Sequence, residues 1–524
     1  MADPIVVGAG ALSIRDVVAV ARDSARVEIA PSALDAVAAS RERVEQVARS
    51  GEPRYGVSTG FGALAVRYIE PDRRRALQRA LVRSHAAGAG ALVETEVVRA
   101  LMLLRLATLS TGRTGVRVET VRAYAGLLNA GITPCVPEYG SLGCSGDLAP
   151  LAHCALTLIG EGQVVDAAGA RIASADALRA AGLQPIELQE KEGLALINGT
   201  DGMLGMLCLA INDMEALVKA ADISASMSLE ALLGTDRVLA ADLMALRPHP
   251  GQAAAARNMV RLLEGSGIVA SHREGDTRVQ DAYSLRCAPQ VAGAVRDTLD
   301  HAAAVAEREL ASAIDNPVVL PDGRIESNGN FHGAPLGYVL DFLAIASADL
   351  ASMAERRTDR MLDTARSRGL PAFLAHDPGV DSGHMIAHYT QAGIVSEMKR
   401  LASPASVDSI PSSAMQEDHV SMGWGAARKL RRSLEDLRIV LAIELLTAAR
   451  ALDLRAPLEP AAGTGAARGA LRERIEGCGP DRQMSPEIEA VTGLLADGAV
   501  VAAVETAIGA LERTSHWMRE RTYE

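Results

Sequence analysis

Two glycine-rich segments hold side chains that could carry out chemistry. Residues 143–146 read Gly-Cys-Ser-Gly, so a thiol and a hydroxyl lie between two glycines. In residues 51–62, four glycines and one proline surround Tyr55, whose phenol could carry a proton. Both segments are also compatible with ordinary tight turns. A nucleophilic thiol at Cys144 and a proton carrier at Tyr55 are therefore hypotheses that other features of the chain must support.

Helices must position these segments. Asp147 suits the N-cap of a helix after the first segment, with Pro150 in its first turn, and Ser13 suits the cap of an earlier one. A hairpin is expected near 162–172, with its turn at Asp166–Gly169. Apolar spacing predicts further helices over 33–50, 72–90, 94–111, 290–314, 335–365, 383–402 and 424–453.

Composition also favours helices. Apolar residues make up 48 % of the 524 residues and aromatic ones only 3 %, and no linker divides the chain. Abundant alanine suits close-packed helices better than sheets. The longest helices are apolar over much of their surface, which is typical of a bundle buried inside an oligomer.

Charge and cysteine usage exclude several classes of partner. The net charge is −12, from 53 Lys+Arg and 65 Asp+Glu, so we expect neither nucleic acid nor a membrane as partner. The six cysteines lack the spacing of a disulfide framework. We find no signal peptide at the start and no apolar run of ~20 residues. These features predict a cytoplasmic protein.

Two weaker motifs suggest other chemistry. Gly8-Ala9-Gly10 imitates a dinucleotide-binding turn, but the third glycine is missing and we expect no βαβ alternation after it. His384 and His388 have the i, i+4 spacing of a metal pair, without a third ligand in view. We therefore expect neither a nucleotide nor a metal. An oxidoreductase remains an alternative on the first motif alone.

The segment Gly143–His153 resembles the signature of the aromatic amino-acid ammonia-lyases, a family that includes histidine, phenylalanine and tyrosine ammonia-lyases and related aminomutases. The resemblance extends from the N-terminus to beyond residue 420. Six further motifs match in order: Tyr55–Gly62, Ser84–Gly88, Asn198–Thr200, Gln280–Arg286, Gly329–His332 and Ser403–Met422.

This resemblance implies an electrophile built from the chain itself, 4-methylidene-imidazol-5-one (MIO). The nitrogen of Gly146 attacks the carbonyl of Cys144, and Ser145 loses water. A side chain at residue 146 would hinder that approach. The family usually has alanine where this chain has Cys144, whose side chain should survive on the ring.

The resemblance also assigns roles around the electrophile. Tyr55 matches the base that takes the β-hydrogen of the substrate, and its pKa near ~10 would have to be lowered, or its proton shared, at neutral pH. Arg286 matches the residue that binds the substrate carboxylate. Other matches orient the substrate or the prosthetic group: Tyr283, Gln280, Asn198 and Phe331.

Three matches favour L-histidine as the substrate: His85, Met385 and Glu417. A carboxylate such as that of Glu417 can accept the N–H of an imidazole and favour its cation. The implied reaction is elimination of ammonia to give urocanate. Four residues depart from the histidine enzymes: Ser58, Asp201, Ala334 and His384. A histidine 2,3-aminomutase that forms β-histidine, a lyase for tyrosine or phenylalanine, and an inactive helical protein therefore remain alternatives.

The implied fold is mainly α and ammonia-lyase/fumarase-like. A smaller mixed N-terminal region, residues 1–200, would carry Cys144-Ser145-Gly146, and residues 201–524 would form a bundle of long helices and the C-terminal helices. The resemblance implies a homotetramer in which each active site draws residues from three chains. Its partner in the reaction would be a small amino acid.

Overall fold

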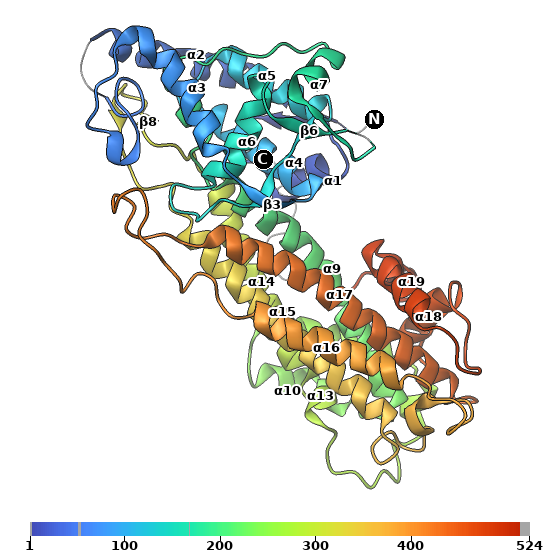
Figure 1. Ribbon diagram of the computed structural model, residues 1–524. Helices are drawn as coiled ribbons and strands as arrows, with labels where there is room; N and C mark the ends of the chain where they lie inside the picture. The colour runs from blue at the N-terminus through green and yellow to red at the C-terminus, as the bar shows by residue number, and fades with distance from the viewer. Residues whose placement is uncertain (1–2, 51–53, 167, 514–524) are drawn as a thin grey trace. The chain divides into compact units, whose positions relative to one another are not determined.

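The computed structural model describes residues 3–50, 54–166 and 168–513. The chain forms two compact units (Figure 1). The first unit consists of Met1–Leu209, Ala304–Asp341 and Pro404–Arg428, and the second of Ala210–Ala303, Phe342–Ser403 and Lys429–Glu524. The domain division expected at residue 200 stays a prediction. Gly51–Pro53 of the glycine-rich segment and Ala167 of the hairpin lie outside the described residues.

Short strands and medium-length helices make up most of the first unit. They are β1 (Ile5–Val7), α1 (Ile14–Arg22), β2 (Val27–Ile29), α2 (Pro31–Ser50), α3 (Arg74–His85), β3 (Ala89–Leu92), α4 (Thr95–Leu109), α5 (Val118–Asn129), β4 (Thr133–Pro134), β5 (Pro137–Tyr139), α6 (Leu148–Leu158), β6 (Gln163–Val165), β7 (Arg171–Ala173), α7 (Ser174–Ala180), α8 (Glu192–Ala195), β8 (Val318–Val319) and β9 (Ile325–Glu326).

Long helices dominate the rest of the chain. Four of them contribute residues to both units: α9 (Asp201–Ala231), α14 (Ala288–Leu310), α15 (Ala334–Leu362) and α17 (Gly423–Asp453). The second unit adds α10 (Ala241–Ala245), α11 (Pro250–Leu263), α12 (Gly267–Ala270), α13 (Tyr283–Arg286), α16 (Met385–Leu401), α18 (Ala462–Arg472), α19 (Ser485–Ala496) and α20 (Ala499–Ile508). The predicted mainly α fold with long helices is confirmed.

The small sheets confirm one prediction and correct two. Strands β6 and β7 pair in antiparallel register, so the expected hairpin is present. Strands β1 and β2 pair in parallel on either side of α1, so the expectation of no βαβ alternation is wrong. The helix predicted over 72–90 ends at His85, where Ala86 has a non-helical backbone conformation. Residues 89–92 form β3 instead.

Capping explains how two helices begin. Ser13 forms the expected cap of α1, with its side chain accepting from Asp16 N–H. Asp147 occupies the N-cap position of α6, but its side chain makes no capping bond there. Its Oδ2 instead accepts from Gly202 N–H and Met203 N–H, each at 2.9 Å, in the first turn of α9. The carboxylate of Asp147 therefore caps a different helix from the one expected.

Buried ion pairs connect the long helices within the second unit. Glu444 on α17 accepts from Ser224 and Ser228 on α9 and from Arg357 on α15. Asp222 on α9 pairs with Arg296 on α14 at 2.6 Å. Because buried charges need such partners, these contacts fix which helix faces meet. The predicted helix bundle thus has a specific polar interior.

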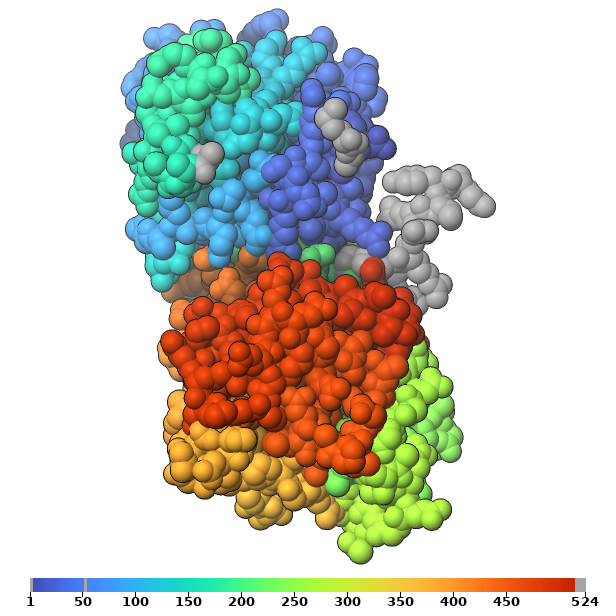
Figure 2. Space-filling view, turned by 90° about the vertical axis from the view of Figure 1, so that its right-hand side faces the viewer, coloured from blue at the N-terminus to red at the C-terminus, as the bar shows by residue number. Residues whose placement is uncertain are grey.

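Apolar helices complete the second unit. In Figure 2 the orange and red atoms of the chain beyond residue 430 form one continuous face of this unit. By length and composition α15, and the bent pair α19–α20, could cross a membrane. The most apolar stretch of α15 is 61 % buried inside the protein, as expected of a core helix.

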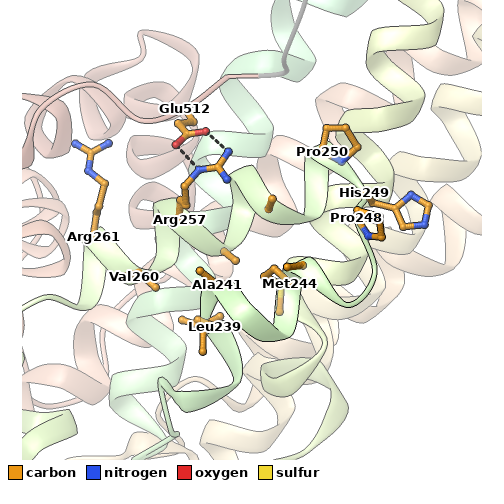
Figure 3. Close-up of a pocket in the computed structure, with 14 residues that line it drawn as sticks. Leu239, Ala241, Met244, Pro248, His249, Pro250, Arg257, Val260, Arg261 and Glu512 are labelled. Carbon is orange, nitrogen blue, oxygen red and sulfur yellow. Dashed lines mark hydrogen bonds and ion pairs between the residues drawn. The ribbon is translucent and has the colours of Figure 1, made fainter.

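A cavity of about 660 Å³ lies beside α10 and α11 (Figure 3). Its wall is mostly apolar, with an ion pair between Arg257 and Glu512 at 2.6 Å. None of the site residues expected from the sequence lines this cavity, so we do not assign it to the candidate site.

Candidate active site

The Gly-Cys-Ser-Gly turn is closely enclosed within the first unit. Gly143 and Gly146 have left-handed φ values of +65° and +76°. A Cβ atom on Gly146 would lie 2.0 Å from the carbonyl oxygen of Gly199, and the N–H of Asp147 donates to that same oxygen at 2.7 Å. Glycine is therefore required at residue 146 by both conformation and space.

Two later segments pack against the same turn. The carbonyl oxygen of Gly143 accepts from Gly333 N–H at 3.0 Å and from the hydroxyl of Ser421 at 2.8 Å. These bonds bring the segment that holds Phe331 and the segment 403–422 to the turn. The first unit thereby gathers motifs that are nearly 280 positions apart in the chain, Ser421 lying 278 residues from Gly143.

The carboxylate of Glu417 lies against the reactive triplet. The thiol of Cys144 donates to Glu417 Oε2 at 3.4 Å, and the hydroxyl of Ser145 donates to Oε1 at 3.5 Å. Ser412 also donates to this carboxylate, at 3.1 Å. The turn that presents Glu417 contains three consecutive non-glycine residues, 413–415, with left-handed φ. Such strain is typical of functional sites.

Tyr55 is held inside its own loop. Its phenol oxygen accepts from Gly62 N–H at 3.3 Å, and its ring meets that of Phe61 edge-on. Burial raises the pKa of Tyr55, the Gly62 N–H lowers it, and the charges on Glu417 and Asp315 raise it further. This net shift is opposite to the lowering that a tyrosinate base would need at neutral pH, which leaves proton sharing as the workable form of the hypothesis.

His85 ends α3 as a neutral imidazole. Burial lowers its pKa, while a hydrogen bond to Leu81 and the charge on Glu417 act in the opposite sense. Its Nδ1 lies 2.9 Å from the carbonyl oxygen of Leu81, so this nitrogen carries the proton. The other nitrogen, Nε2, is thereby left as an acceptor.

Asn198 lies next to Gly199 under the triplet. Its main-chain oxygen accepts from Arg105 at 2.6 Å. Its side-chain Oδ1 is buried without a hydrogen-bond partner among residues 3–50, 54–166 and 168–513. A buried polar atom without a partner is costly and suits a position that a ligand completes.

Four expected residues belong to the second unit. Gln280, Tyr283 and Arg286 lie on one short segment, and Met385 begins α16. The guanidinium of Arg286 stacks on the ring of Tyr283 at 4.7 Å. Its Nε is buried and has no partner within the described part of the chain. Tyr283 is 70 % exposed, which is unusual for an aromatic side chain.

The four departures from the histidine pattern have local environments of their own. Ser58 is buried and accepts from Arg54 N–H at 2.9 Å. Asp201 lies 3.3 Å from Arg105. His384 bonds to the hydroxyl of Thr447 at 3.1 Å, and Ala334 is the first residue of α15. Three of these residues thus make specific polar contacts in the fold.

The structure also tests the alternative chemistry. Burial and the nearby Glu417 raise the pKa of the Cys144 thiol to about 11, so it is a poor thiolate nucleophile at neutral pH. His388 bonds to Glu355 at 2.6 Å, whereas His384, the other histidine of the i, i+4 pair, bonds to Thr447. Sequence reasoning missed Asp147, Gly199 and Ser421 as enclosing residues. All three stand in or beside matched motifs, but spacing alone does not reveal which motifs touch.

Comparison with known proteins identifies the family. A family model described as aromatic amino acid lyase matches residues 12–473. The chain belongs to this family. This aromatic amino acid lyase is 63 % identical over 508 residues to the histidine ammonia-lyase of Streptomyces avermitilis, covering 97 % of this chain and 99 % of that one. The predicted enzyme class, a carbon–nitrogen lyase, is confirmed, and the oxidoreductase alternative is set aside.

Solved structures agree with this assignment. The tyrosine aminomutase of Streptomyces globisporus superposes on this lyase with a TM-score of 0.92 at 38 % identity, covering 98 % of this chain and all of that one. The histidine ammonia-lyase of Trypanosoma cruzi gives a TM-score of 0.89 at 37 % identity, covering 97 % and 96 %. The predicted ammonia-lyase fold is therefore confirmed.

Proposed function

We propose that this enzyme eliminates ammonia from L-histidine to give urocanate, as a cytoplasmic homotetramer. The observation that carries the proposal is the position of Glu417, whose carboxylate contacts both Cys144 and Ser145. An acceptor at this place suits a substrate whose side chain carries an N–H. The high identity to histidine ammonia-lyases supports the same substrate.

The residues present fit the prosthetic group MIO. Gly146 leaves no room for a Cβ atom beside Gly199, and cyclisation likewise needs a residue without a side chain at this position. The buried side-chain oxygen of Asn198, below the triplet, has no hydrogen-bond partner among the residues that the structure describes. Cys144, Ser145 and Gly146 would form the group, and its electrophilic methylidene would make the substrate's amino group a better leaving group.

The chain's own residues would bind the substrate and move a proton. Tyr55, with its phenol oriented by Gly62, would take the β-hydrogen. The guanidinium of Arg286, pre-oriented by Tyr283, would bind the carboxylate through two parallel hydrogen bonds. Glu417 would accept from the imidazole, and the neutral His85 and Met385 would line the same side of the substrate. Gln280 and Phe331 would complete the pocket.

Exposed apolar side chains support the tetramer. Val279 and Tyr283, on the segment that carries Arg286, are 94 % and 70 % exposed, and Tyr389 on α16 is 64 % exposed. Large apolar side chains in such positions are typical of surfaces that another chain covers. A site completed by other copies would place these residues in an interior.

Two measurements test the proposal. Intact-mass spectrometry should show the loss of two water molecules per chain, and a mass equal to the plain sequence in active enzyme would exclude MIO. Incubation with L-histidine, followed by ultraviolet absorbance and NMR, should show urocanate. Turnover of tyrosine or phenylalanine but not histidine would contradict the role given to Glu417.

An aminomutase is the second candidate. It is favoured by the close superposition with a tyrosine aminomutase, at a TM-score of 0.92. Such an enzyme would return ammonia to the β-carbon, so β-histidine in the same NMR experiment would identify it.

A further inference from the structure

A buried arginine joins the end of α2 to the last residues of the loop that carries Tyr55. We call residues 54–70 the Tyr55 loop; it lies between α2 and the start of α3. Arg74, the first residue of α3, is only 2 % exposed. A buried guanidinium must find acceptors for its donors, so its partners are fixed features of the fold.

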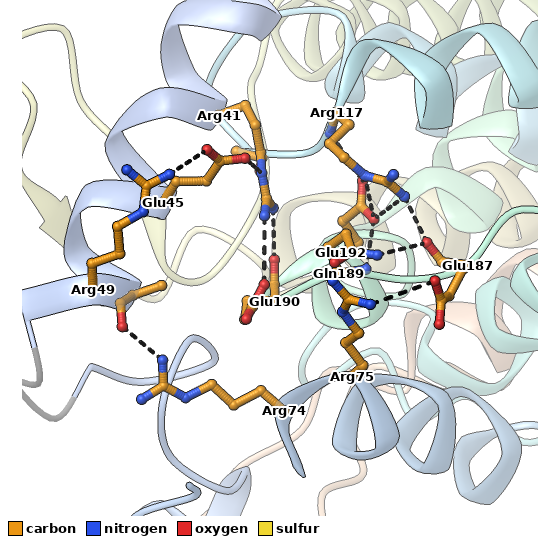
Figure 4. Close-up of polar contacts among 12 residues, drawn as sticks. Arg41, Glu45, Arg49, Arg74, Arg75, Arg117, Glu187, Gln189, Glu190 and Glu192 are labelled. Carbon is orange, nitrogen blue, oxygen red and sulfur yellow. Dashed lines mark hydrogen bonds and ion pairs between the residues drawn. The ribbon is translucent and has the colours of Figure 1, made fainter. Parts of the chain in front are cut away.

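The acceptors of Arg74 lie on both sides of the loop. Its Nη1 donates to the carbonyl oxygen of Ala48 at 2.7 Å, in the last turn of α2 (Figure 4). Its Nε donates to the carbonyl oxygen of Ile69 at 3.1 Å, and its Nη2 to the phenol of Tyr68 at 3.0 Å. The last carbonyls of a helix have no partner inside the helix and attract a cation. Arg74 therefore links the end of α2 to Tyr68 and Ile69, the last part of the loop before α3.

A short ladder carries this constraint toward Tyr55. Ile69 N–H donates to the carbonyl oxygen of Ser58 at 2.9 Å, and Thr59 and Tyr68 form an isolated antiparallel bridge. Ser58 N–H in turn donates to the carbonyl oxygen of Arg54 at 3.0 Å, and the Ser58 hydroxyl accepts from Arg54 N–H. Tyr55 is the next residue. The contacts thus run without a gap from Arg74 to the backbone of Tyr55.

Other charged side chains lie near Arg74, but the three groups that accept its hydrogen bonds are uncharged: two carbonyl oxygens and a phenol. A cavity of about 780 Å³ beside it is lined by Arg41, Arg49, Arg75 and Arg117 and by carboxylates of Glu45, Glu187 and Glu190. In Figure 4 Arg41, Arg49 and Arg75 pair with these carboxylates. The guanidinium of Arg74 instead donates to a carbonyl oxygen, that of Ala48. The role of Arg74 is thus to hold backbone and phenol oxygens in fixed positions.

We propose that Arg74 is a positioning residue for Tyr55, which sets where the phenol lies for proton transfer. This inference rests on the function proposed for Tyr55 above. Lysine keeps the charge but replaces the planar fork with a single ammonium group, which cannot reach three acceptors in fixed directions. Misplacement of a reacting group by about 1 Å can cost about 100-fold in rate.

The test is a double-mutant cycle on the full-length enzyme. Arg74→Lys should lower kcat by about 10- to 100-fold with little change in KM. It should also raise the kinetic isotope effect of a β-deuterated substrate, because proton transfer becomes slower, and leave the loss of two waters intact. Arg75→Lys is the matched control, since Arg75 is the next residue, is 60 % exposed and pairs loosely with Glu187 at 3.7 Å.

The cycle separates this inference from the proposed function. In a Tyr55→Phe background, Arg74→Lys should cause no further loss of kcat, because its effect passes through Tyr55. An equal loss in both backgrounds, or a wild-type rate and isotope effect for Arg74→Lys, overturns the inference. Full activity of Tyr55→Phe overturns the role of Tyr55 itself, and this inference with it.

A milder variant covers the case in which Arg74→Lys does not fold. Tyr68→Phe removes the acceptor of Nη2 but keeps the ring beside the guanidinium, which lies 5.7 Å from the ring centroid. It should raise the isotope effect in the same direction by a smaller amount. An unchanged isotope effect in this variant overturns the inference as well.

Discussion

The thiol of Cys144 donates a hydrogen bond to the carboxylate of Glu417, although the two residues stand 273 positions apart in the chain. Burial and Glu417 itself raise the pKa of the thiol to about 11, so the thiol keeps its proton and remains a donor at neutral pH. Cys144 thereby orients the carboxylate of Glu417, which we propose accepts a hydrogen bond from the imidazole of the substrate. The unusual residue of the triplet thus has a role outside the ring chemistry.

Replacing this thiol should weaken substrate recognition and leave the prosthetic group intact. Cys144→Ala loses a hydrogen bond worth about 1 kcal/mol, which corresponds to a fall in kcat/KM of about fivefold. Only the main chain of residue 144 takes part in cyclisation, so intact-mass spectrometry should still show the loss of two waters. Complete loss of activity in a chain with that mass would contradict the supporting role.

Removing the charge of Glu417 should shift the pH profile. Burial raises the pKa of Tyr55 and the Gly62 N–H lowers it, while the negative charge of Glu417 opposes ionisation. If Tyr55 takes the β-hydrogen, kcat should rise with pH as its phenol loses its proton. In Glu417→Gln the phenol loses that proton more readily, so this rise should move to lower pH. We also expect kcat/KM for L-histidine to fall about 10- to 100-fold, as for loss of a hydrogen bond to a charged group.

The neighbouring Asp418 supplies the control for this variant. Its side chain is exposed, so Asp418→Asn removes the same charge without touching the triplet. Its pH–rate profile should match that of the parent enzyme. An equal shift in both variants would show that net charge alone moves the profile.

A methyl group at residue 146 should prevent maturation of the site. In Gly146→Ala the new Cβ would lie 2.0 Å from the carbonyl oxygen of Gly199, in a backbone with φ +76°. We expect the mass of the plain sequence and no measurable turnover. Gly131→Ala is the matched control: Gly131 has a similar φ of +68°, but no atom of the described residues lies within 4 Å of the place that an added Cβ would take.

The control isolates the cause. Left-handed strain alone costs about 1–2 kcal/mol, so Gly131→Ala should lower Tm and keep both the mass loss and the activity. If Gly146→Ala also loses two waters, cyclisation does not require glycine at residue 146, and the close contact with Gly199 does not explain why glycine is present there.

His384 should make the enzyme sensitive to mild acid. Burial lowers its pKa to about 3, so the folded protein holds it neutral while the unfolded chain binds a proton below about pH 6.5. Its contribution to stability is complete above pH 6.5 and is lost progressively as pH falls toward 3. At pH 5.5 the loss is about 1.4 kcal/mol.

Thermal unfolding of His384→Phe checks this linkage. The phenyl ring has no proton to bind, so Tm should fall less between pH 7.5 and 5.5 than in the parent protein. Parallel falls of Tm in the two proteins would contradict a neutral, buried His384.

Local pattern explains why the helices were predictable and why the site was only partly so. The spacing of Leu430, Leu434 and Leu437 marks α17 because a helix buries every third or fourth residue. The cap predicted for Asp147 is wrong. A carboxylate before an apolar run fits the N-cap of α6, and only the fold shows that α9 begins beside it. Likewise, contact between Glu417 and Cys144 depends on packing between segments that no sequence period connects.

The enclosure of the triplet has a consequence for how the enzyme is made. Gly199 packs closely against Gly146, and Gly333 and Ser421 donate hydrogen bonds to the carbonyl oxygen of Gly143. The ribosome adds residues in sequence order, so Ser421 is added to the chain long after Ser145. The chain must therefore be synthesised through Ser421 before the surroundings of the triplet are complete, which makes the proposed cyclisation an event that follows translation of the site.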